Sequence, residues 1–491
     1  IDGEFTLMAD KDGVLDASYI GFIAQSVAIK GRNVVAITLA EDVKVLNEVV
    51  VTALGIKRSQ KALSYNVQQV NGDDLTTVKD ANFVNSLNGK VAGVNINASA
   101  AGTGGATRVV MRGTKSISAN NNALYVIDGV PIYNRNNGQT SGEYSSQPGG
   151  EGISDLNPDD IESISVLSGP SAAALYGSTA AQGVILVTTK RGKGGKAHIS
   201  VSTSASVVIP TNMLQLTDAY DYATYYNQML KNDASDTKKP FSAAILQKFK
   251  DHSDPIRFPD TDWIDYCFKN AAMQTQHNVN ISGGTEKVRY FVSLGAFTQD
   301  GLFKQQALPY DFNFKYRRFN YRANLDYDMT PTTTLSVNIG GRVDNKNTPF
   351  SGEDNNQLFR HLYWATPFSS PGIVDGKFVM SANNYDDEQL PFVGASGLGA
   401  YYGMGYMSAS TNTLNADVIL NQKLDFFTRG LSFKLKGSYN SDYTVTKSRS
   451  SSVATYNPIL QSDGTIAYRK NGNDSQLGYA EGFGKGRNWY F

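Results

Sequence analysis

Residues whose types and spacing could do chemistry are few and scattered in this chain. The glycine-rich segment 101–106 could approach the phosphates of a dinucleotide, but an expected strand at 108–111 follows it where that site needs a helix. Its third glycine is also misplaced, so we interpret the segment as a flexible loop. The glycine–lysine pairs at 89–90, 192–193, 195–196, 376–377 and 484–485 lack the following Ser or Thr of a phosphate-binding loop.

Metal-ligating and acid–base residues show no better arrangement. The four histidines have no metal-ligand spacing and are His198, His252, His277 and His361. The single cysteine, Cys267, is expected to be a small buried residue. Residues 10–13 could begin a calcium loop but lack its later acidic ligands, and Asp254, Asp260 and Asp262 are expected in a solvated loop. We therefore predict no enzyme, no metal and no cofactor.

The elements that must position any other site are strands with two unlike faces. In residues 319–329 the odd positions are apolar or aromatic, whereas the even positions are polar and include Arg322, Asp326 and Asp328. Alternation with period two predicts a strand, and about eleven residues is the length that a tilted strand needs to cross a bilayer. In an outer-membrane barrel the apolar face meets lipid and the charged face meets a watery lumen. A half-buried strand of a soluble sandwich also alternates, so one strand does not decide between a membrane barrel and a soluble sandwich.

Recurrence of this pattern and the lengths of the connections favour the barrel. Similar alternation occurs in segments 198–209, 278–281, 288–296, 335–344, 414–425 and 431–440. Short links at 282–287, 330–334 and 428–430 alternate with long ones at 210–273, 299–316, 346–410 and 444–476. Short turns on one side and long loops on the other are typical of outer-membrane barrels, and a soluble sandwich has no reason to keep that order. We predict a transmembrane antiparallel β-barrel.

Composition agrees with this class. Lysine plus arginine equal aspartate plus glutamate at 45 each, which argues against a nucleic-acid binder. Tyr (27) and Phe (23) suit aromatic girdles at the two membrane interfaces. No apolar run nears the roughly eighteen residues of a transmembrane helix. A closed barrel of about eight strands has room inside only for side chains and could not surround the folded unit expected at 58–190. We therefore expect the chain to be part of a longer polypeptide.

Two units are expected before the barrel. Residues 1–40 read as short strands at 4–8, 15–22 and 34–39. Residues 58–190 read as a compact α/β unit with a helix near 83–91 capped by Asp80, strands at 109–111, 123–127 and 183–189, and a turn at Asp128-Gly129. Between them, residues 48–52 could be a buried strand or a segment that pairs with a partner's sheet edge; composition alone favours the buried strand.

Four stretches together resemble one family. They are residues 47–55 (NEVVVTALG), 111–113 (MRG), 124–131 (LYVIDGVP) and 174–192 (ALYGS to GVILVTTKRG). In this order, and followed by barrel strands, they resemble a SusC/RagA-type TonB-linked outer-membrane transporter. The resemblance implies a barrel of about 22 strands, of which residues 191–491 hold the first eight or so. It makes residues 58–190 the plug, 41–57 a linker with the Ton box, and 1–40 the C-terminal part of a carboxypeptidase-regulatory-like β domain.

The resemblance also implies sites and partners. It reverses the preference for a buried strand and makes Glu48, Val49, Val50, Val51 and Thr52 the Ton box, captured by TonB. The plug-motif residues are Arg112, Gly113, Asp128, Gly129 and Gly177, with Arg112 expected in an ion pair. The implied function is TonB-dependent import of oligosaccharides across the outer membrane under a SusD-like lipoprotein lid, with dimers of transporter–lid pairs. Oligopeptides are the alternative substrate; a soluble β-rich glycan-binding module and a passive porin are alternatives of other classes.

Candidate substrate contacts are polar residues after a plug strand and aromatic residues in the long loops. They are Tyr133, Asn134, Arg135, Trp263, Tyr363, Trp364, Tyr401 and Tyr402. Aromatic rings stack on sugar faces and on peptide side chains, but also serve at surfaces and in girdles.

Overall fold

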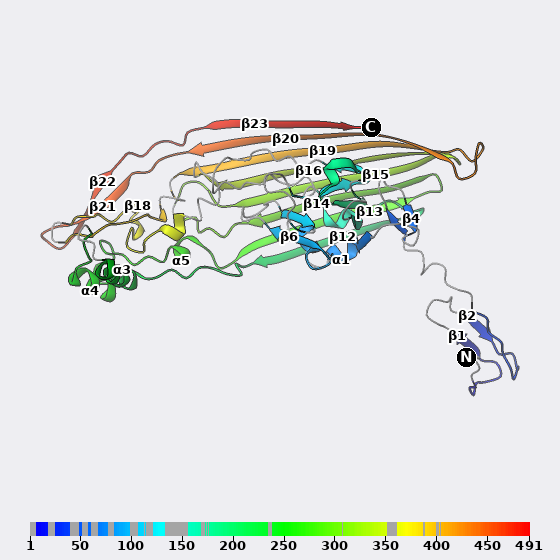
Figure 1. Ribbon diagram of the computed structural model, residues 1–491, viewed down its shortest axis with the longest axis horizontal. Helices are drawn as coiled ribbons and strands as arrows, with labels where there is room; N and C mark the ends of the chain where they lie inside the picture. The colour runs from blue at the N-terminus through cyan, green and yellow to red at the C-terminus, as the bar shows by residue number, and fades with distance from the viewer. Residues whose placement is uncertain are drawn as a thin grey trace.

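A long curved sheet dominates the computed structural model, with a small folded unit against one of its faces and helices beyond one of its ends (Figure 1). The structure describes residues 6–17, 25–39, 49–51, 57–59, 67–76, 83–98, 107–111, 113, 121–132, 156–167, 172, 174, 176–233, 238–306, 308–350, 361–385, 388–398, 402 and 404–491.

Eight antiparallel strands form the curved sheet in chain order. They are β12 (Gly195–Val208), β13 (Ala272–Gly284), β14 (Val288–Asp300), β15 (Lys315–Thr330), β16 (Thr333–Pro349), β19 (Gly405–Lys423), β20 (Ser432–Ser450) and β23 (Ala480–Tyr490). The expected strands and the alternation of short and long connections are confirmed. Several strands are longer than a bilayer requires, such as β19 and β20 with 19 residues each.

The two faces of this sheet are reversed relative to a soluble protein. Exposed apolar side chains on its outer face include Val201, Leu294, Phe319, Val418, Phe433 and Leu435. Buried polar side chains on its inner face include Asn278, Arg322, Asn324, Asn338, Asp417 and Ser438. Phe319 is 55% exposed, whereas the next inner residue along β15, Asn320, is 6% exposed. A wall of this kind is suited to lipid outside and to a polar filling inside.

That filling is the five-stranded plug sheet, ordered β5-β10-β11-β8-β9. Its strands are β5 (Val67–Asn71), β10 (Ile161–Leu167), β11 (Val184–Thr189), β8 (Leu124–Ile127) and β9 (Val130–Ile132). Beside it lie α1 (Gly72–Thr76), η3 (Phe83–Leu87), β6 (Val94–Ala98), β7 (Thr107–Met111), η5 (Pro158–Asp160) and η6 (Gly177–Ala180). The helix expected near 83–91 is a short 3-10 helix, and its apolar residues Phe83, Val84, Leu87 and Val91 join the plug core. Asp80 lies outside the described residues.

Long connections beyond one end of the sheet fold into what we call the loop domain. It contains α3 (Ala219–Asp233), α4 (Ala243–Asp251), α5 (Trp263–Cys267) and a four-stranded sheet of β17 (Gly372–Val374), β18 (Lys377–Val379), β21 (Thr455–Leu460) and β22 (Ile466–Asn471). Phe241, Phe249 and Phe368 lie at its centre with ring centroids 5.3–6.1 Å apart. Ser242 caps α4 by accepting from the Ile245 amide at 3.2 Å. None of the described helices is long and apolar enough to cross a membrane.

The N-terminal segments lie toward the end of the sheet that carries the short turns (Figure 1). β1 (Val14–Ala17) pairs with β2 (Gln25–Ala28), and β3 (Val49–Val51) pairs with β4 (Lys57–Ser59). The strand expected at 34–39 is wrong, because this segment pairs with no other strand in the part of the chain that the structure describes, and Val34 is 85% exposed. Residues 6–8 of the strand expected at 4–8 are also not in a strand.

Candidate functional site: the contact between plug and barrel wall

A buried ion pair joins the plug to the wall. Asp160 ends η5, and Arg322 points from β15 toward it, with Nε 3.6 Å from Oδ2. The two side chains are only 3% and 8% exposed. Burial raises the pKa of Asp160, and the charge of Arg322 acts against this rise. A charge pair this far from water loses much stability if one partner is removed.

Two asparagines extend this contact to the neighbouring strands. Asn157 caps η5 by accepting from the Asp159 amide, and its Nδ2 donates to Oδ1 of Asn278 on β13 at 2.7 Å. Asn278 in turn donates to the carboxylate of Asp159. Gly295 of β14 lies beside this bond, and a Cβ at that position would be 2.7 Å from Asn157 Nδ2 and 2.8 Å from Asn278 Oδ1. Glycine is therefore required for the plug to approach the wall here.

A second contact forms where the last plug strand leads into the barrel. Asn324 of β15 donates to the backbone oxygen of Lys190 at 2.7 Å and to Oγ1 of Thr189 at 3.0 Å. Two residues further along β15, Asp326 accepts a hydrogen bond at Oδ1 from Arg191 at 2.7 Å. The inner, polar face of β15 therefore contacts the plug at Arg322 and Asn324, and at Asp326 it contacts the link between the plug and the wall.

The turn Asp128-Gly129 makes a third contact. Both residues have positive φ, 48° and 87°, which allows the tight connection between β8 and β9. The Asp128 carboxylate accepts from the amide of Thr189 at 3.0 Å and from its hydroxyl at 2.7 Å. Lys436 of β20 donates to the backbone oxygen of Asp128 at 2.7 Å. A cavity of about 270 Å³ adjoins this turn and is lined by plug and wall residues.

The chain resembles known proteins over most of its length. Residues 59–184 match the TonB-dependent receptor plug domain. The TonB-dependent receptor SusC of Bacteroides thetaiotaomicron is 30% identical over 401 residues, which cover 78% of this chain and 36% of that protein. The TonB-dependent receptor P3 of Formosa agariphila is 30% identical over 345 residues, or 70% of this chain and 29% of that one. The chain thus spans about a third of the length of these relatives.

A solved structure agrees in fold. The structure of the RagAB peptide importer in the "open-open" state superposes with a TM-score of 0.61 at 21% identity, covering 82% of this chain and 43% of that one. A plug-domain match, followed by wall strands of the same fold, decides the family. The chain belongs to the SusC/RagA type of TonB-dependent outer-membrane transporters.

The Ton-box candidate is partly described. The backbone of Val49–Val51 pairs with Lys57–Ser59 in a short antiparallel hairpin, while Glu48 and Thr52 lie outside the described residues. Among the described residues β3 pairs only with β4, along one edge, and a partner strand could pair with main-chain groups on the other edge. The plug-motif residue Arg112 also lies outside the described residues, whereas Gly113 and Gly177 have φ of 82° and 71°.

The predicted substrate contacts fall into three groups. Tyr133, Asn134, Arg135 and Tyr401 lie outside the described residues. Trp263 is fully buried and donates from Nε1 to the Thr366 oxygen at 2.9 Å, and Tyr402, 1% exposed, donates to the Lys304 oxygen at 3.0 Å. Both are therefore core residues of the loop domain, and their prediction as ligand contacts is wrong for this arrangement. Tyr363 and Trp364 are exposed, at 46% and 58%.

Sequence reasoning missed the residues that join plug and wall. Asn157, Asp160, Gly295 and Lys436 were not singled out. The run Asn-Pro-Asp-Asp at 157–160, a capping residue and a proline before an apolar strand, is a signal that could have found the first two. The described residues contain no group of three or more His, Cys, Asp or Glu side chains that could hold a metal.

Proposed function

We propose that the complete polypeptide imports its substrate across the outer membrane with energy delivered by TonB. The observation that carries this proposal is the plug held against the polar face of an inside-out wall through Asp160, Asn157, Thr189 and Asp128. Water can replace each of these polar contacts, so the plug can be displaced without exposing a large apolar surface.

The steps follow from this arrangement. Substrate binds on the side of the plug that faces the loop domain, where a SusD-like lipoprotein covers it. TonB adds a strand to the segment around Val49–Val51 from the periplasm, and main-chain hydrogen bonds supply the affinity. The inner-membrane proton gradient then supplies the pull, which shifts the plug and breaks contacts such as Arg322–Asp160. These steps need no nucleotide or redox cofactor in this chain.

Two substrate classes are candidates. The family resemblance favours oligosaccharides. The RagAB structure, described as a peptide importer, supports oligopeptides as the second class. Exposed aromatic rings such as Tyr363 suit either class.

A proline in the Ton box tests the energised mechanism. Val50→Pro removes a backbone N–H that strand addition needs, whereas Val50→Ile keeps both the N–H and the β preference. We expect cells with Val50→Pro to lose substrate uptake while binding to the purified protein is kept, and Val50→Ile to behave as the parent. Unchanged uptake with Val50→Pro would indicate a passive porin, and recovery of the full-length protein in the soluble fraction would contradict the membrane assignment.

A further inference from the structure

A cationic surface lies on the outward side of β20 and β23, near the loop-bearing ends of these strands. Side chains of β20 alternate between the two faces of the wall, and its outward positions include the exposed Phe433, Leu435 and Tyr443. On β23, Lys485 lies directly opposite Tyr443 and therefore shares this outward face, as does Arg487, the next residue on the same side of the strand. Both cations are exposed.

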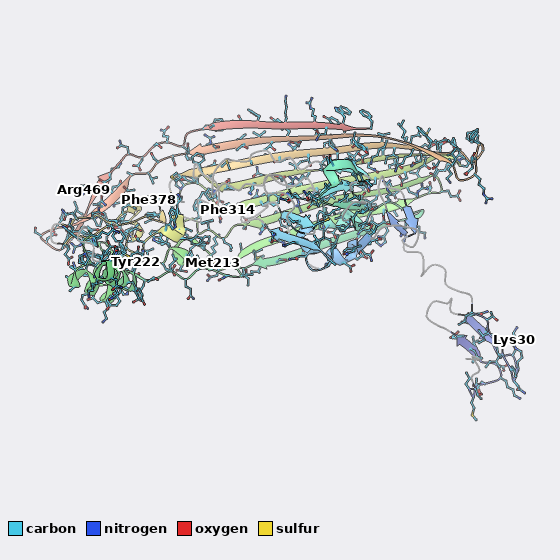
Figure 2. All side chains as sticks on the ribbon, viewed as in Figure 1. Lys30, Met213, Tyr222, Phe314, Phe378 and Arg469 are labelled. Atoms are coloured by element: carbon cyan, nitrogen blue, oxygen red, sulfur yellow. The ribbon has the colours of Figure 1, made fainter. Side chains whose placement is uncertain are left out.

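These cations lie toward the end of the wall that carries the long loops. Figure 2 marks this end by Phe314 and Arg469, whereas Lys30 lies beyond the opposite end. β20 runs from Ser432 after a short turn to Ser450 before a long connection. In an outer-membrane barrel the long loops are extracellular, so the two cations are on the side of the outer leaflet.

The rise of the strand places them at the edge of the lipid. A strand rises about 3.3 Å per residue, so Tyr443 is about 33 Å from Phe433 along β20. At a tilt of about 35–45° this distance corresponds to roughly 23–27 Å in height, close to the apolar band of about 25 Å. Phe433 lies near the short turn, where an interfacial aromatic residue is expected. Lys485, opposite Tyr443, therefore lies at the outer boundary of the band.

Exposed aromatic rings flank the two cations. On one side, Trp489 packs beside Tyr439 with ring centroids 4.4 Å apart. On the other side, Phe483 stacks on Tyr443 with centroids 6.4 Å apart and the ring planes at 25°. Phe483 and Trp489 are 67% and 66% exposed. Trp489 suits the interfacial belt, and Phe483, nearer the long loops than Lys485, offers a flat ring on which a sugar face can stack.

Positive charge exceeds negative charge on this face of β20 and β23, which are both fully described. Glu481 lies opposite Lys447, and these two charges offset each other. The guanidinium of Arg449 lies 4.5 Å from the ring centre of Tyr479 and adds a third cation to the surface. On the neighbouring strand β19, the outward positions at this level are neutral: Ser408, Ser410 and Asn412. The cations are thus concentrated on two strands.

The ligand that fits this surface combines phosphate groups, a sugar and acyl chains. Guanidinium and ammonium groups bind phosphate through charge-assisted hydrogen bonds, and basic clusters at a membrane boundary attract anionic headgroups. A glycerophospholipid has one phosphate and no sugar ring, so it would give Phe483 no ligand contact. A phosphorylated glycolipid brings phosphates to the cations, a sugar face to Phe483 and acyl chains to the apolar wall.

We propose that the outward surface formed by Arg449, Phe483, Lys485 and Arg487 binds a phosphorylated glycolipid of the outer leaflet. Because this surface continues the lipid-facing side of the wall, its occupant is a membrane lipid rather than a soluble protein. The site is separate from the plug side of the wall. It depends on the membrane location of the family and not on the substrate or on TonB, so the Val50→Pro experiment tests a different proposal.

Native mass spectrometry of the full-length transporter, purified in detergent and freed of lipid, tests this proposal. The probes are a lipid A with two phosphates, the same lipid A with its phosphates removed, and phosphatidylglycerol. We expect the diphosphorylated form to bind about tenfold or more tightly than the dephosphorylated form. Lys485→Gln with Arg487→Gln should remove this difference. Lys231→Gln with Lys238→Gln, at two exposed lysines of the loop domain, is the matched control and should keep it.

A substitution of the exposed ring tests the sugar contact. Phe483→Ser should weaken binding of both forms of lipid A several-fold, because the ring contacts the sugar and not the phosphates. Phe426→Ser, at an 81% exposed ring near the short turn after β19, is the control and should leave both affinities unchanged. A gel-mobility shift of the folded barrel confirms that each variant has folded.

Three outcomes would overturn the proposal. The first is equal binding of the two forms of lipid A, and the second is an equal loss of affinity in the two double variants. The third is binding of phosphatidylglycerol as tight as that of the diphosphorylated lipid A, which would assign the surface to glycerophospholipids instead.

Discussion

Lys436 of β20 donates a hydrogen bond to the backbone oxygen of Asp128, a residue 308 positions earlier in the chain. The donor lies on the wall and the acceptor on the β8–β9 turn of the plug. Of the plug–wall contacts described above, this hydrogen bond joins the two residues that are farthest apart in the sequence. It places the turn against β20, while Asp128 uses its side chain to hold Thr189 of β11.

Removal of this donor is expected to loosen the turn. Lys436→Met loses a charged hydrogen bond of about 1.5–3 kcal/mol but keeps the length of the side chain. Amide hydrogen exchange in β9 should therefore be faster by tenfold or more. Lys447→Met, at an exposed position of the same strand, is the control and should leave amide exchange in β9 unchanged. Equal exchange in both variants would show that the bond does not restrain the plug.

A methyl group at Gly295 is expected to push the plug away from the wall. The added Cβ would meet the Asn157–Asn278 bond at under 3 Å on both sides. We expect Gly295→Ala to lose about 1–3 kcal/mol of stability and to make the plug more susceptible to protease. Gly482→Ala on β23 has no atom within 4 Å of its Cβ and serves as the control. Equal protease resistance in the two variants would contradict this role of Gly295.

For the Arg322–Asp160 ion pair we predict that a single substitution and a double substitution affect stability differently. Asp160→Ala leaves Arg322 buried without its anion and should lower the free energy of unfolding by about 3–5 kcal/mol. Replacing both, by Asp160→Leu with Arg322→Met, should recover most of that loss. Urea unfolding of the plug measures both. Asp474→Asn breaks the exposed Lys470–Asp474 pair and should change stability by less than about 1 kcal/mol. A double variant no more stable than the single one would refute coupling.

Because the thiol of Cys267 is buried, we expect the folded protein to lose stability at alkaline pH. Burial raises the pKa of this thiol from 9.0 to about 12. In the unfolded chain the thiol ionises near pH 9, but in the folded chain it stays protonated, so its contribution to stability is lost as pH rises from about 9 toward 12. Cys267→Ala should show a flatter decline over this range. A decline of the same slope would show that other groups cause it.

Thiol labelling at pH 8 checks the same burial independently. A maleimide should react slowly with Cys267 in the folded protein and rapidly after unfolding, because the reactive thiolate is scarce and enclosed. Ser462→Cys in a Cys267→Ala background places a thiol on the exposed β21–β22 turn and should react at once. Comparable rates for the two thiols would contradict the buried position.

Periodic local patterns made much of the fold predictable. Alternation of side chains with period two depends only on residues two apart, so the strands of the wall, their lipid-facing and lumen-facing sides and the order of short and long connections follow from the chain itself. The same reasoning placed Arg322 and Asp326 on the inner face, where the structure has them in ion pairs. It failed at residues 34–39, which pair with no strand among the residues that the structure describes.

Tertiary structure alone decided the contacts and the interior of the loops. Trp263 and Tyr363 have the same aromatic character in sequence, yet one fills the loop-domain core and the other lines a cavity, because burial depends on packing between segments far apart in the chain. Partners such as Asp160 with Arg322, or Asp128 with Lys436, depend on how the plug docks in the curved wall. The sequence determined the wall and its two faces because these are local properties; docking joins residues that no local pattern links, so only the folded chain could reveal the contacts that hold the plug.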